Sequence, residues 1–319
     1  MTPELVQISP LRAIVSERLS EKFVIHRLWE AEDPDALLAQ IGPRVRGLLA
    51  GGTRIDGSFM DRLPALEIIA AFGVGYDQID AEAAAGRGVV VTHTPDVLSD
   101  EVADITIALL IGTVRRLPQA QDYLRAGKWA EQGAFPLTAS LRGRKVGIFG
   151  LGRIGKAIWK RLDAMGLEVA YCGRNRQDLP LNYFDDITEL ARACDVLILA
   201  APGTEETQGI VDEDVLDALG RDGFLINIGR GALVNEADLA AALAQGRIAG
   251  AGLDVFADEP HPLPALLEAP NTMLLPHVAS ASDHTRDAMG QLVVDNVTSW
   301  FERGRPVTPV PESRSLLTE

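Results

Sequence analysis

The sequence predicts an α/β protein with two domains, each built around a parallel sheet. The chain has 319 residues, which is more than one hydrophobic core comfortably supports. Short apolar segments alternate along it with helical segments, as in parallel strands joined by crossover helices. The motif Gly150-x-Gly152-x-x-Gly155 stands between one such strand and helix, a setting typical of a Rossmann-type, doubly wound sheet.

The first domain is predicted as a smaller flavodoxin-like α/β domain, formed by residues 1–98 together with 284–319. Its apolar runs predict buried strands at residues 23–29, 45–50, 66–72 and 89–93. Thr94 and Pro95 end the last of these strands. A helix rich in Ala, Ile and Leu follows over residues 99–117, and the first crossing between the domains is expected there.

The second domain is predicted over residues 99–283. Its buried parallel strands are expected at residues 145–149, 168–173, 196–200, 224–228, 248–255 and 273–275. Asn235 is the expected N-cap of a helix over residues 236–245, and Gly246 is its stop. A last helix over residues 285–303 is expected to return to the first domain, and residues 306–319 are expected to form a loose tail.

Each glycine of the motif permits something that a side chain would prevent. Gly150 allows a tight exit from the strand, Gly152 lets the backbone approach a pyrophosphate, and Gly155 lets the helix pack closely on the strand. The helix N-terminus then offers N–H groups and a partial positive charge to a phosphate. The motif therefore predicts a dinucleotide site, and a glycine-rich turn without a ligand is the alternative.

The end of the next strand indicates which dinucleotide binds. An NAD site would place Asp or Glu there to accept a hydrogen bond from the ribose 2′-hydroxyl, and neither is present. Arg174, Asn175 and Arg176 supply two guanidinium groups and an amide, which suit a 2′-phosphate. The predicted cofactor is NADP, with NADPH preferred over NADH, and a solvated basic turn is the alternative.

Composition argues against several other classes of function. Forty-five acidic residues against thirty Lys and Arg give a net charge of −15, so neither a nucleic acid nor an anionic membrane is expected as a partner. No apolar run is long enough to span a bilayer and no targeting signal is recognised, so we expect a cytoplasmic location. Cys172 and Cys194 lack metal-ligand spacing and are expected to be packing residues; no metal site is predicted.

Three segments at predicted strand ends carry candidates for chemistry. They are Asn227-Ile-Gly-Arg230-Gly, Asp254-Val-Phe-Ala-Asp-Glu259-Pro and Leu275-Pro-His277-Val-Ala-Ser280. Ligands bind beyond the carboxyl ends of parallel strands, so a cation, an acid and an imidazole there can converge. Each residue alone is more often an ion-pair partner, a turn residue or a satisfied polar group, and their joint occurrence favours a catalytic site. The other histidines are expected to be structural: His26, His93, His261 and His284.

Together with the glycine motif, these segments resemble the D-isomer-specific 2-hydroxyacid dehydrogenase family. The resemblance covers nearly the whole chain, including Ala71-Phe-Gly-Val-Gly75-Tyr-Asp and Val102-Ala-Asp-Ile-Thr106. The strand end at Arg174 and the modest length are most similar to NADPH-dependent glyoxylate or hydroxypyruvate reductases. The resemblance implies reduction of a small 2-oxo acid to the D-2-hydroxy acid.

The resemblance also implies a role for each candidate residue. Arg230 would hold the substrate carboxylate and polarise its carbonyl, while His277 would protonate the carbonyl oxygen. Glu259 would orient the imidazole and favour its protonated form. The N–H groups of Val74 and Gly75 would form a second carboxylate clamp in the first domain.

Further cofactor contacts are implied by matching segments. They are Thr106, Gly150, Leu151, Gly152, Arg153, Ile154, Gly155, Arg174, Asn175, Arg176, Ala201, Pro202, Thr207, Ile228, Gly229, Asp254 and Ser280. Pro202 could equally be a simple strand terminator. The family also implies a homodimer formed through residues 99–117.

Several alternatives remain open. The substrate could be a bulkier 2-oxo acid, such as an aryl pyruvate or 2-ketogluconate. The side chains of Trp129 and Phe135 could each be a core residue, a dimer contact or part of a lid. Formate dehydrogenases of this family pair their His with Gln, so Glu259 argues against that activity, and a longer phosphoglycerate dehydrogenase would need a further domain. Family corepressors that sense NAD(H) leave a non-catalytic NADP(H)-binding protein as the alternative from another class.

Overall fold

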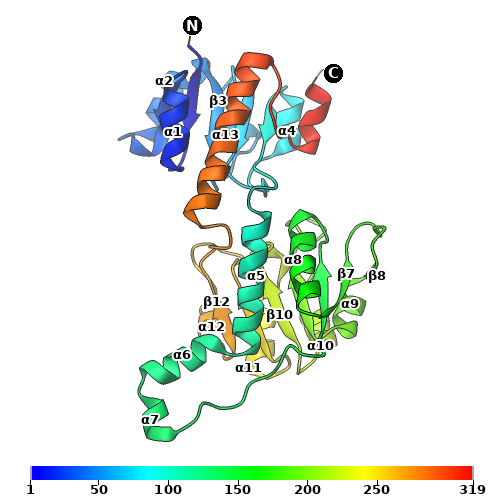
Figure 1. The fold of residues 1–319 in the computed structure, drawn as a ribbon. Coiled ribbons are helices and arrows are strands. Elements are labelled where there is room, and N and C mark those ends of the chain that lie inside the picture. The colour runs from blue at the N-terminus through cyan, green and yellow to red at the C-terminus, as the bar shows by residue number, and fades with distance from the viewer. Residues whose placement is uncertain (1, 318–319) are drawn as a thin grey trace. The chain divides into compact units, whose positions relative to one another are not determined.

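The computed structural model describes residues 2–317, which form two compact units (Figure 1). Unit 1 takes its residues from Met1–Leu98 and Ser282–Glu319, and unit 2 is Ser99–Ala281. The second boundary follows residue 281, two residues before the boundary predicted after residue 283. Each unit contains a sheet of parallel strands with helices on both faces, so the predicted α/β fold class is confirmed.

Unit 1 contains a five-stranded sheet in the order β2-β1-β3-β4-β5, with all neighbouring strands parallel. This is the flavodoxin-like strand order. The strands are β1 (Glu4–Gln7), β2 (Val24–Arg27), β3 (Val45–Ala50), β4 (Ile68–Ala71) and β5 (Val90–Thr92). Strand β1 was not predicted, because only Leu5 and Val6 between its two polar ends are apolar. Both are nevertheless fully buried, because β1 lies inside the sheet between β2 and β3.

Helices cover both faces of the unit 1 sheet. On one face α1 (Ala13–Ser20) packs against α13 (Asp283–Arg303), and Val15, Leu19, Val293 and Val297 are buried there against Leu49. The other face carries α2 (Pro34–Ile41), α3 (Gly57–Met60) and α4 (Ala81–Gly86). Two 3-10 turns complete the connections, η1 (Leu28–Glu30) and η2 (Gly42–Arg44). The last long helix is therefore part of unit 1.

The C-terminal segment belongs to the core of unit 1, so the prediction of a loose tail was wrong up to residue 317. Val310 is fully buried, and its N–H donates to the Val91 carbonyl at 3.0 Å. The 3-10 helix η4 (Pro311–Leu316) follows. Composition did not predict this packing, because a proline-rich segment without periodicity does not indicate which distant part of the chain it contacts. The predicted tail residues 318–319 lie outside the described residues.

Ser313 anchors this segment, which leads to a stability prediction. Its fully buried hydroxyl accepts a hydrogen bond from the Val91 N–H at 2.8 Å. Ser313→Ala leaves that buried N–H without a partner, so the free energy of unfolding should fall by about 1–3 kcal/mol. Chemical denaturation measures this, with Ser315→Ala as control because Ser315 is exposed in the same turn. Equal stability of the two variants would show that the hydrogen bond between the Val91 N–H and the Ser313 hydroxyl does not stabilise the fold.

Unit 2 contains a seven-stranded parallel sheet in the order β12-β11-β10-β9-β6-β7-β8. The strands are β6 (Lys145–Phe149), β7 (Glu168–Cys172), β8 (Asn182–Phe184), β9 (Val196–Leu199), β10 (Phe224–Asn227), β11 (Gly250–Leu253) and β12 (Thr272–Leu274). The chain runs outward from β6 to β8 and then returns to the other side of β6 with β9. The strand order therefore reverses between β6 and β9, where Rossmann-type sheets bind their ligands. The short edge strand β8 was not predicted.

The helices of unit 2 also lie on both faces of its sheet. One face carries α5 (Ser99–Val114) and α8 (Arg153–Ala164), which pack against each other. The other carries α9 (Ile187–Ala193), α10 (Glu213–Leu219), α11 (Glu236–Ala244) and α12 (Pro264–Leu267), with η3 (Gly231–Leu233) before α11. Asn235 caps α11 as predicted, because its Oδ1 accepts from the N–H groups of Ala237 and Asp238.

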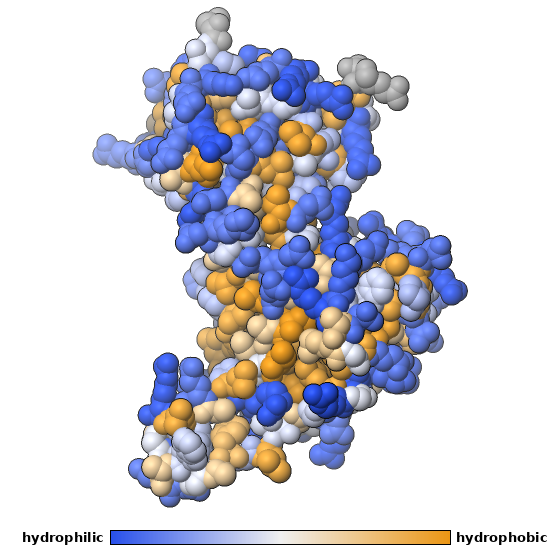
Figure 2. Space-filling view, in the orientation of Figure 1, coloured by the Kyte–Doolittle hydropathy of each residue, from blue (hydrophilic) through white to orange (hydrophobic). Residues whose placement is uncertain are grey.

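The predicted helix over residues 99–117 is broken near its end. α5 stops at Val114, and Arg116 adopts a left-handed φ of 52° before α6 (Leu117–Arg125) begins. Together with α7 (Lys128–Gln132), α6 stands away from the unit 2 sheet, and apolar colour covers part of this arm (Figures 1 and 2). Leu124 and Trp129 are 56% and 63% exposed. Trp129 is therefore not a core residue of unit 2.

Within residues 2–317 no helix is both long and apolar enough to cross a membrane. The same residues contain no cluster of three or more His, Cys, Asp or Glu side chains arranged to hold a metal ion. Both cysteines are free and buried. Burial raises the pKa of Cys172 to about 11 and that of Cys194 to about 12, so both thiols stay neutral and pack as small apolar side chains.

Candidate active site

The glycine turn after β6 has little room for side chains except at its middle position. Gly150 has a φ of +96°, and a Cβ there would lie 2.7 Å from the Ala201 nitrogen; a Cβ on Gly155 would lie 2.2 Å from the Gly150 carbonyl oxygen. A Cβ on Gly152 would meet nothing within 4 Å. The turn therefore packs tightly against the neighbouring strand end and helix, while open space remains beside Gly152.

This open space lies next to the N-terminus of α8. Gly152 is the N-cap of α8 and no side chain caps the helix. The first backbone hydrogen bond of the helix runs from the Lys156 N–H to the Gly152 carbonyl at 2.9 Å. N–H groups and the positive end of the helix dipole are thus presented beside Leu151, Arg153 and Ile154, an arrangement that binds phosphate.

The loop after β7 carries two exposed guanidinium groups. Arg174, Asn175 and Arg176 are all exposed. Among the described residues no carboxylate forms an ion pair with Arg174 or Arg176, although the chain has an excess of acidic residues. Both cations are therefore available to an anion, and this edge of unit 2 suits a phosphate on the adenosine side of a dinucleotide.

Arg230 follows β10 on a loop that Asn227 holds in place. The Asn227 side chain is buried; its Nδ2 donates to the Arg230 carbonyl at 2.8 Å and its Oδ1 accepts from the Gly229 N–H at 3.0 Å. Arg230 Nη1 donates to the Gly229 carbonyl at 2.7 Å. A Cβ on Gly231 would overlap the Phe256 backbone at 1.8 Å, so this loop packs against the segment after β11.

His277 and Glu259 form a close pair. His277 Nδ1 lies 2.6 Å from Glu259 Oε2, and Glu259 Oε1 accepts from the Phe256 N–H at 3.0 Å. Burial alone raises the pKa of Glu259, but the hydrogen bonds from His277 and Phe256 and the charge of Arg230 outweigh it, so the pKa is lowered. A charged Glu259 fixes the imidazole so that the Nδ1–H points at it, which leaves Nε2 for a substrate.

Asp254 holds the backbone on which His277 stands. The side chain of Asp254 is buried and accepts hydrogen bonds from the N–H groups of Val278 and Ala279 at 2.8 and 2.9 Å. The His277 N–H donates to the Asp254 carbonyl at 2.8 Å, and His277 itself has a φ of 53°. Burial raises the pKa of Asp254, although the two N–H donors oppose this effect.

The three candidates come from neighbouring strands. Arg230, Glu259 and His277 follow β10, β11 and β12, which are adjacent in the sheet. The Asp254 N–H donates to the Asn227 carbonyl at 2.9 Å, so the first two strand ends are linked directly. Asn227 and Asp254 thus position the loops of Arg230 and His277. Asn227 was not predicted as a site residue, although an asparagine at the end of a buried strand was a sequence signal that could have identified it.

The remaining predicted cofactor residues occupy different environments. Ala201, Ile228 and Gly229 are buried; Ala201 packs against Gly150, and Gly229 packs against Ala201. The Thr207 hydroxyl donates to the Pro202 carbonyl at 3.0 Å and orders the loop after β9. Thr106 is fully buried in α5, where its hydroxyl donates to the Val102 carbonyl at 2.7 Å. Ser280 is partly buried, three residues beyond His277.

In unit 1, Val74 and Gly75 lie on the turn that follows β4. Among the described residues neither N–H donates a hydrogen bond to the protein. His93 Nδ1 lies 2.9 Å from the Val74 carbonyl, and its ring meets Tyr76 edge-on at 5.6 Å. His93 therefore orders the turn that presents these two N–H groups. A lone His at a strand end gave no sequence signal for this contact.

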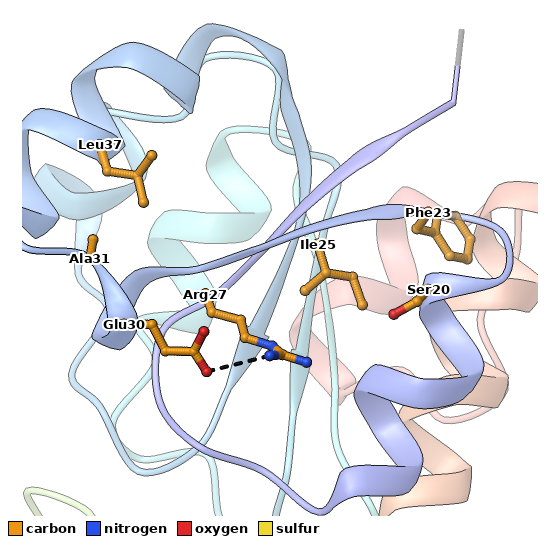
Figure 3. A pocket seen from close by; sticks show the side chains of 7 residues that line it. All are labelled: Ser20, Phe23, Ile25, Arg27, Glu30, Ala31 and Leu37. Atoms are coloured by element: carbon orange, nitrogen blue, oxygen red, sulfur yellow. Dashed lines mark hydrogen bonds and ion pairs between the residues drawn. The ribbon is translucent and has the colours of Figure 1, made fainter.

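A separate hollow of about 430 Å³ lies in unit 1 (Figure 3). It is lined by Ser20, Phe23, Ile25, Arg27, Glu30, Ala31 and Leu37. None of the predicted site residues lines it, and its two charged groups pair with each other, Arg27 Nη1 lying 3.4 Å from Glu30 Oε1. We assign no function to this hollow, because its third polar side chain is also paired: the Ser20 hydroxyl donates to the Ser16 carbonyl.

Comparisons with known proteins agree with this geometry. Three relatives span almost the whole chain. A 2-ketogluconate reductase of Gluconobacter oxydans is 44% identical over 97% of this chain and 98% of its own. A glyoxylate/hydroxypyruvate reductase A of Arabidopsis thaliana is 41% identical over 96% and 98%. An NADPH-dependent glyoxylate/hydroxypyruvate reductase from Sinorhizobium meliloti, solved in complex with NADP and malonate, is 50% identical with a TM-score of 0.93 over 98% of both chains.

The family comparison covers more than half of the chain. The model described as D-isomer specific 2-hydroxyacid dehydrogenase, NAD binding domain, matches residues 107–279. That stretch contains the glycine turn, the basic loop after β7 and the three strand ends with Arg230, Glu259 and His277. The family predicted from the motifs is confirmed: this chain belongs to the D-isomer-specific 2-hydroxyacid dehydrogenases.

Proposed function

We propose that this protein is an enzyme that uses NADPH to reduce a small 2-oxo acid, glyoxylate or hydroxypyruvate, to the D-2-hydroxy acid. The observation that carries the proposal is the 2.6 Å pair of His277 and Glu259 beside the strand end that bears Arg230. A proton donor held by a carboxylate next to a guanidinium suits a substrate with a carbonyl beside a carboxylate.

Unit 2 fits the proposed cofactor. The open space at Gly152 and the uncapped N-terminus of α8 would hold the pyrophosphate. Arg174 and Arg176 would pair with the 2′-phosphate, with Asn175 between them. When bound, NADPH supplies the hydride that adds to the carbonyl carbon. The relative from Sinorhizobium meliloti that is named NADPH-dependent supports this cofactor choice.

Each of the three candidates has a defined part in the reduction. Arg230 binds the carboxylate of the substrate and polarises its carbonyl oxygen, which gains negative charge as the carbon is reduced. His277 Nε2 gives its proton to that oxygen, and in the reverse direction takes it back. Glu259 keeps the Nδ1–H in place and stabilises the positive ring before transfer. Val74 and Gly75 are proposed, from the family resemblance, to donate their N–H groups to the carboxylate.

A test of substrate size separates the proposal from its main alternative. Purified protein should be assayed with NADPH and a series of 2-oxo acids from glyoxylate through hydroxypyruvate to phenylpyruvate and 2-ketogluconate. We expect the highest kcat/KM for the two smallest acids. The 2-ketogluconate reductase relative favours the alternative of a bulkier substrate, and a clear preference for 2-ketogluconate or phenylpyruvate would establish it. Binding of NADPH without turnover of any acid would indicate a sensor protein.

Glu259→Gln should lower the rate of reduction by roughly 10- to 100-fold, part of the about 10²- to 10⁴-fold that acid–base catalysis contributes. The amide still accepts a hydrogen bond but no longer stabilises the charged ring. Because the pKa of Glu259 is lowered, its contribution is present through neutral pH and is lost only in acid. Because the variant lacks the negative charge that stabilises the protonated ring, reduction by the variant should decline with rising pH earlier than reduction by the wild type.

The matched control for this change is Glu268→Gln, because Glu268 is an exposed glutamate at the end of α12, in the same connection between β11 and β12 that carries Glu259. The measurement is the rate–pH profile of the wild type, Glu259→Gln and Glu268→Gln in both reaction directions. A Glu259→Gln profile that superimposes on those of wild type and control would contradict the assigned role.

The homodimer and the cytoplasmic location stay predictions. The arm formed by α6 and α7 supports the first, because Leu124 and Trp129 expose large apolar surfaces that a second copy would cover. Trp129 is then proposed as a dimer contact. The buried neutral thiols of Cys172 and Cys194 are compatible with a reducing compartment.

A further inference from the structure

The basic loop after β7 is tied to the rest of unit 2 by neutral hydrogen bonds on both sides of its arginines. On the near side, the Tyr183 hydroxyl donates to the Gly173 carbonyl at 3.0 Å. On the far side, the Gln177 N–H donates to the Tyr171 hydroxyl at 2.6 Å. Tyr171 and Tyr183 also pack ring against ring, with centroids 5.3 Å apart, and Tyr171 is fully buried. The segment that carries Arg174 and Arg176 is therefore anchored by hydrogen bonds at both ends.

Gln177 makes a third contact, which reaches the glycine turn. Its side-chain Nε2 donates to the Leu151 carbonyl at 2.9 Å. Leu151 lies between Gly150 and Gly152, so the loop proposed for the 2′-phosphate is bonded directly to the turn proposed for the pyrophosphate. The amide of Gln177 is the only side-chain bridge between these two segments that the described hydrogen bonds contain.

We propose that Gln177 is a positioning residue for cofactor selection: by tying the Arg174–Arg176 loop to Leu151, it fixes the guanidinium groups where a 2′-phosphorylated dinucleotide presents its phosphate. The inference rests on the proposed NADP-binding function. Arg174 and Arg176 are exposed and make no ion pair among the described residues, so nothing in their own side chains holds them in place. Ordering them on binding would cost conformational entropy, and a preformed loop reduces that cost.

The bridge acts on the phosphorylated cofactor selectively. A cofactor without the 2′-phosphate gains nothing from the position of the two arginines. Any change in the Leu151 carbonyl itself affects the pyrophosphate turn and therefore both cofactors alike. The ratio of the two affinities thus isolates the contribution of the bridge, and a general loss of stability would leave the ratio unchanged.

Gln177→Met tests the proposal, because methionine has a similar length and flexibility but cannot donate to the Leu151 carbonyl. Titration calorimetry with NADP⁺ and with NAD⁺ gives both dissociation constants. We expect the Kd for NADP⁺ to rise about 5-fold, as the loss of one hydrogen bond implies, and the Kd for NAD⁺ to stay within about 2-fold. The NADPH-to-NADH ratio of kcat/KM should fall by the same factor as the affinity ratio.

Two further variants complete the experiment. Tyr183→Phe frees the other end of the loop and should shift the ratio in the same direction, while Gln40→Met, at an exposed position of α2, should leave it unchanged. An unchanged NADP⁺-to-NAD⁺ ratio in Gln177→Met would overturn the inference. If the wild type itself binds both cofactors equally, the proposed NADP preference fails instead, and the two failures are thus distinguishable.

Discussion

His277→Ala should lower the rate of hydroxypyruvate reduction by about 10³-fold while the Kd for NADPH stays within about 2-fold of the wild-type value. The imidazole is the proposed proton donor, and Glu259, 2.6 Å from its Nδ1, can only hold it in place. The cofactor turn and the basic loop follow other strands, β6 and β7, and are unaffected by the change. Initial rates and fluorescence titration with NADPH measure the two quantities.

His261→Ala is the matched control for this variant. His261 is exposed on the segment that follows Glu259, and among the residues that the structure describes only its backbone N–H makes a hydrogen bond, to the Asp258 carbonyl at 2.7 Å. The control should retain wild-type turnover. Residual activity of His277→Ala within 10-fold of the control would exclude His277 as the proton donor, whatever the cofactor affinity.

Replacing both arginines of the basic loop, Arg174→Ala with Arg176→Ala, should raise the Kd for NADPH by about 100-fold and that for NADH by less than about 3-fold. Each guanidinium is expected to form charge-assisted hydrogen bonds with the 2′-phosphate, each contributing about 1.5 kcal/mol or more. Neither arginine is engaged in an ion pair among the described residues, so removing them breaks no other such contact.

The double variant Arg142→Ala with Arg221→Ala removes the same net charge from exposed positions of unit 2. It controls for the change in the overall field of an already acidic protein, which acts on both cofactors. Equal weakening of NADPH and NADH by the loop variant would mean that the arginines do not read the 2′-phosphate. Raising the salt concentration should reduce the wild-type preference, since salt screens exposed ion pairs.

The sequence was most informative where backbone geometry demands one residue type. The glycine turn was predictable because only glycine fits the positive φ of Gly150 and the contact of Gly155 with the Gly150 carbonyl. The arrangement of Arg230, Glu259 and His277 was predictable because each of three successive apolar strands is followed by a segment that carries polar side chains. Parallel strands bring such ends to one edge of a sheet.

Other features depend on contacts between residues far apart in sequence. β1 and the C-terminal segment are held by partners elsewhere in the chain, such as the Val91 N–H bonded to the Ser313 hydroxyl. No local periodicity records such pairing. The same holds for Asn227, Gln177 and His93, whose side chains order loops through carbonyl groups that every residue has. The roles of the site residues remain proposals that the variants above test.

The proposed reaction is tested most directly by the kcat/KM of the purified wild-type protein for hydroxypyruvate, with NADPH and NADH measured side by side and the enantiomer of the product assigned. We expect rapid oxidation of NADPH, a clearly lower kcat/KM with NADH, and D-glycerate as the product. L-glycerate, or a preference for NADH, would contradict the proposed reaction.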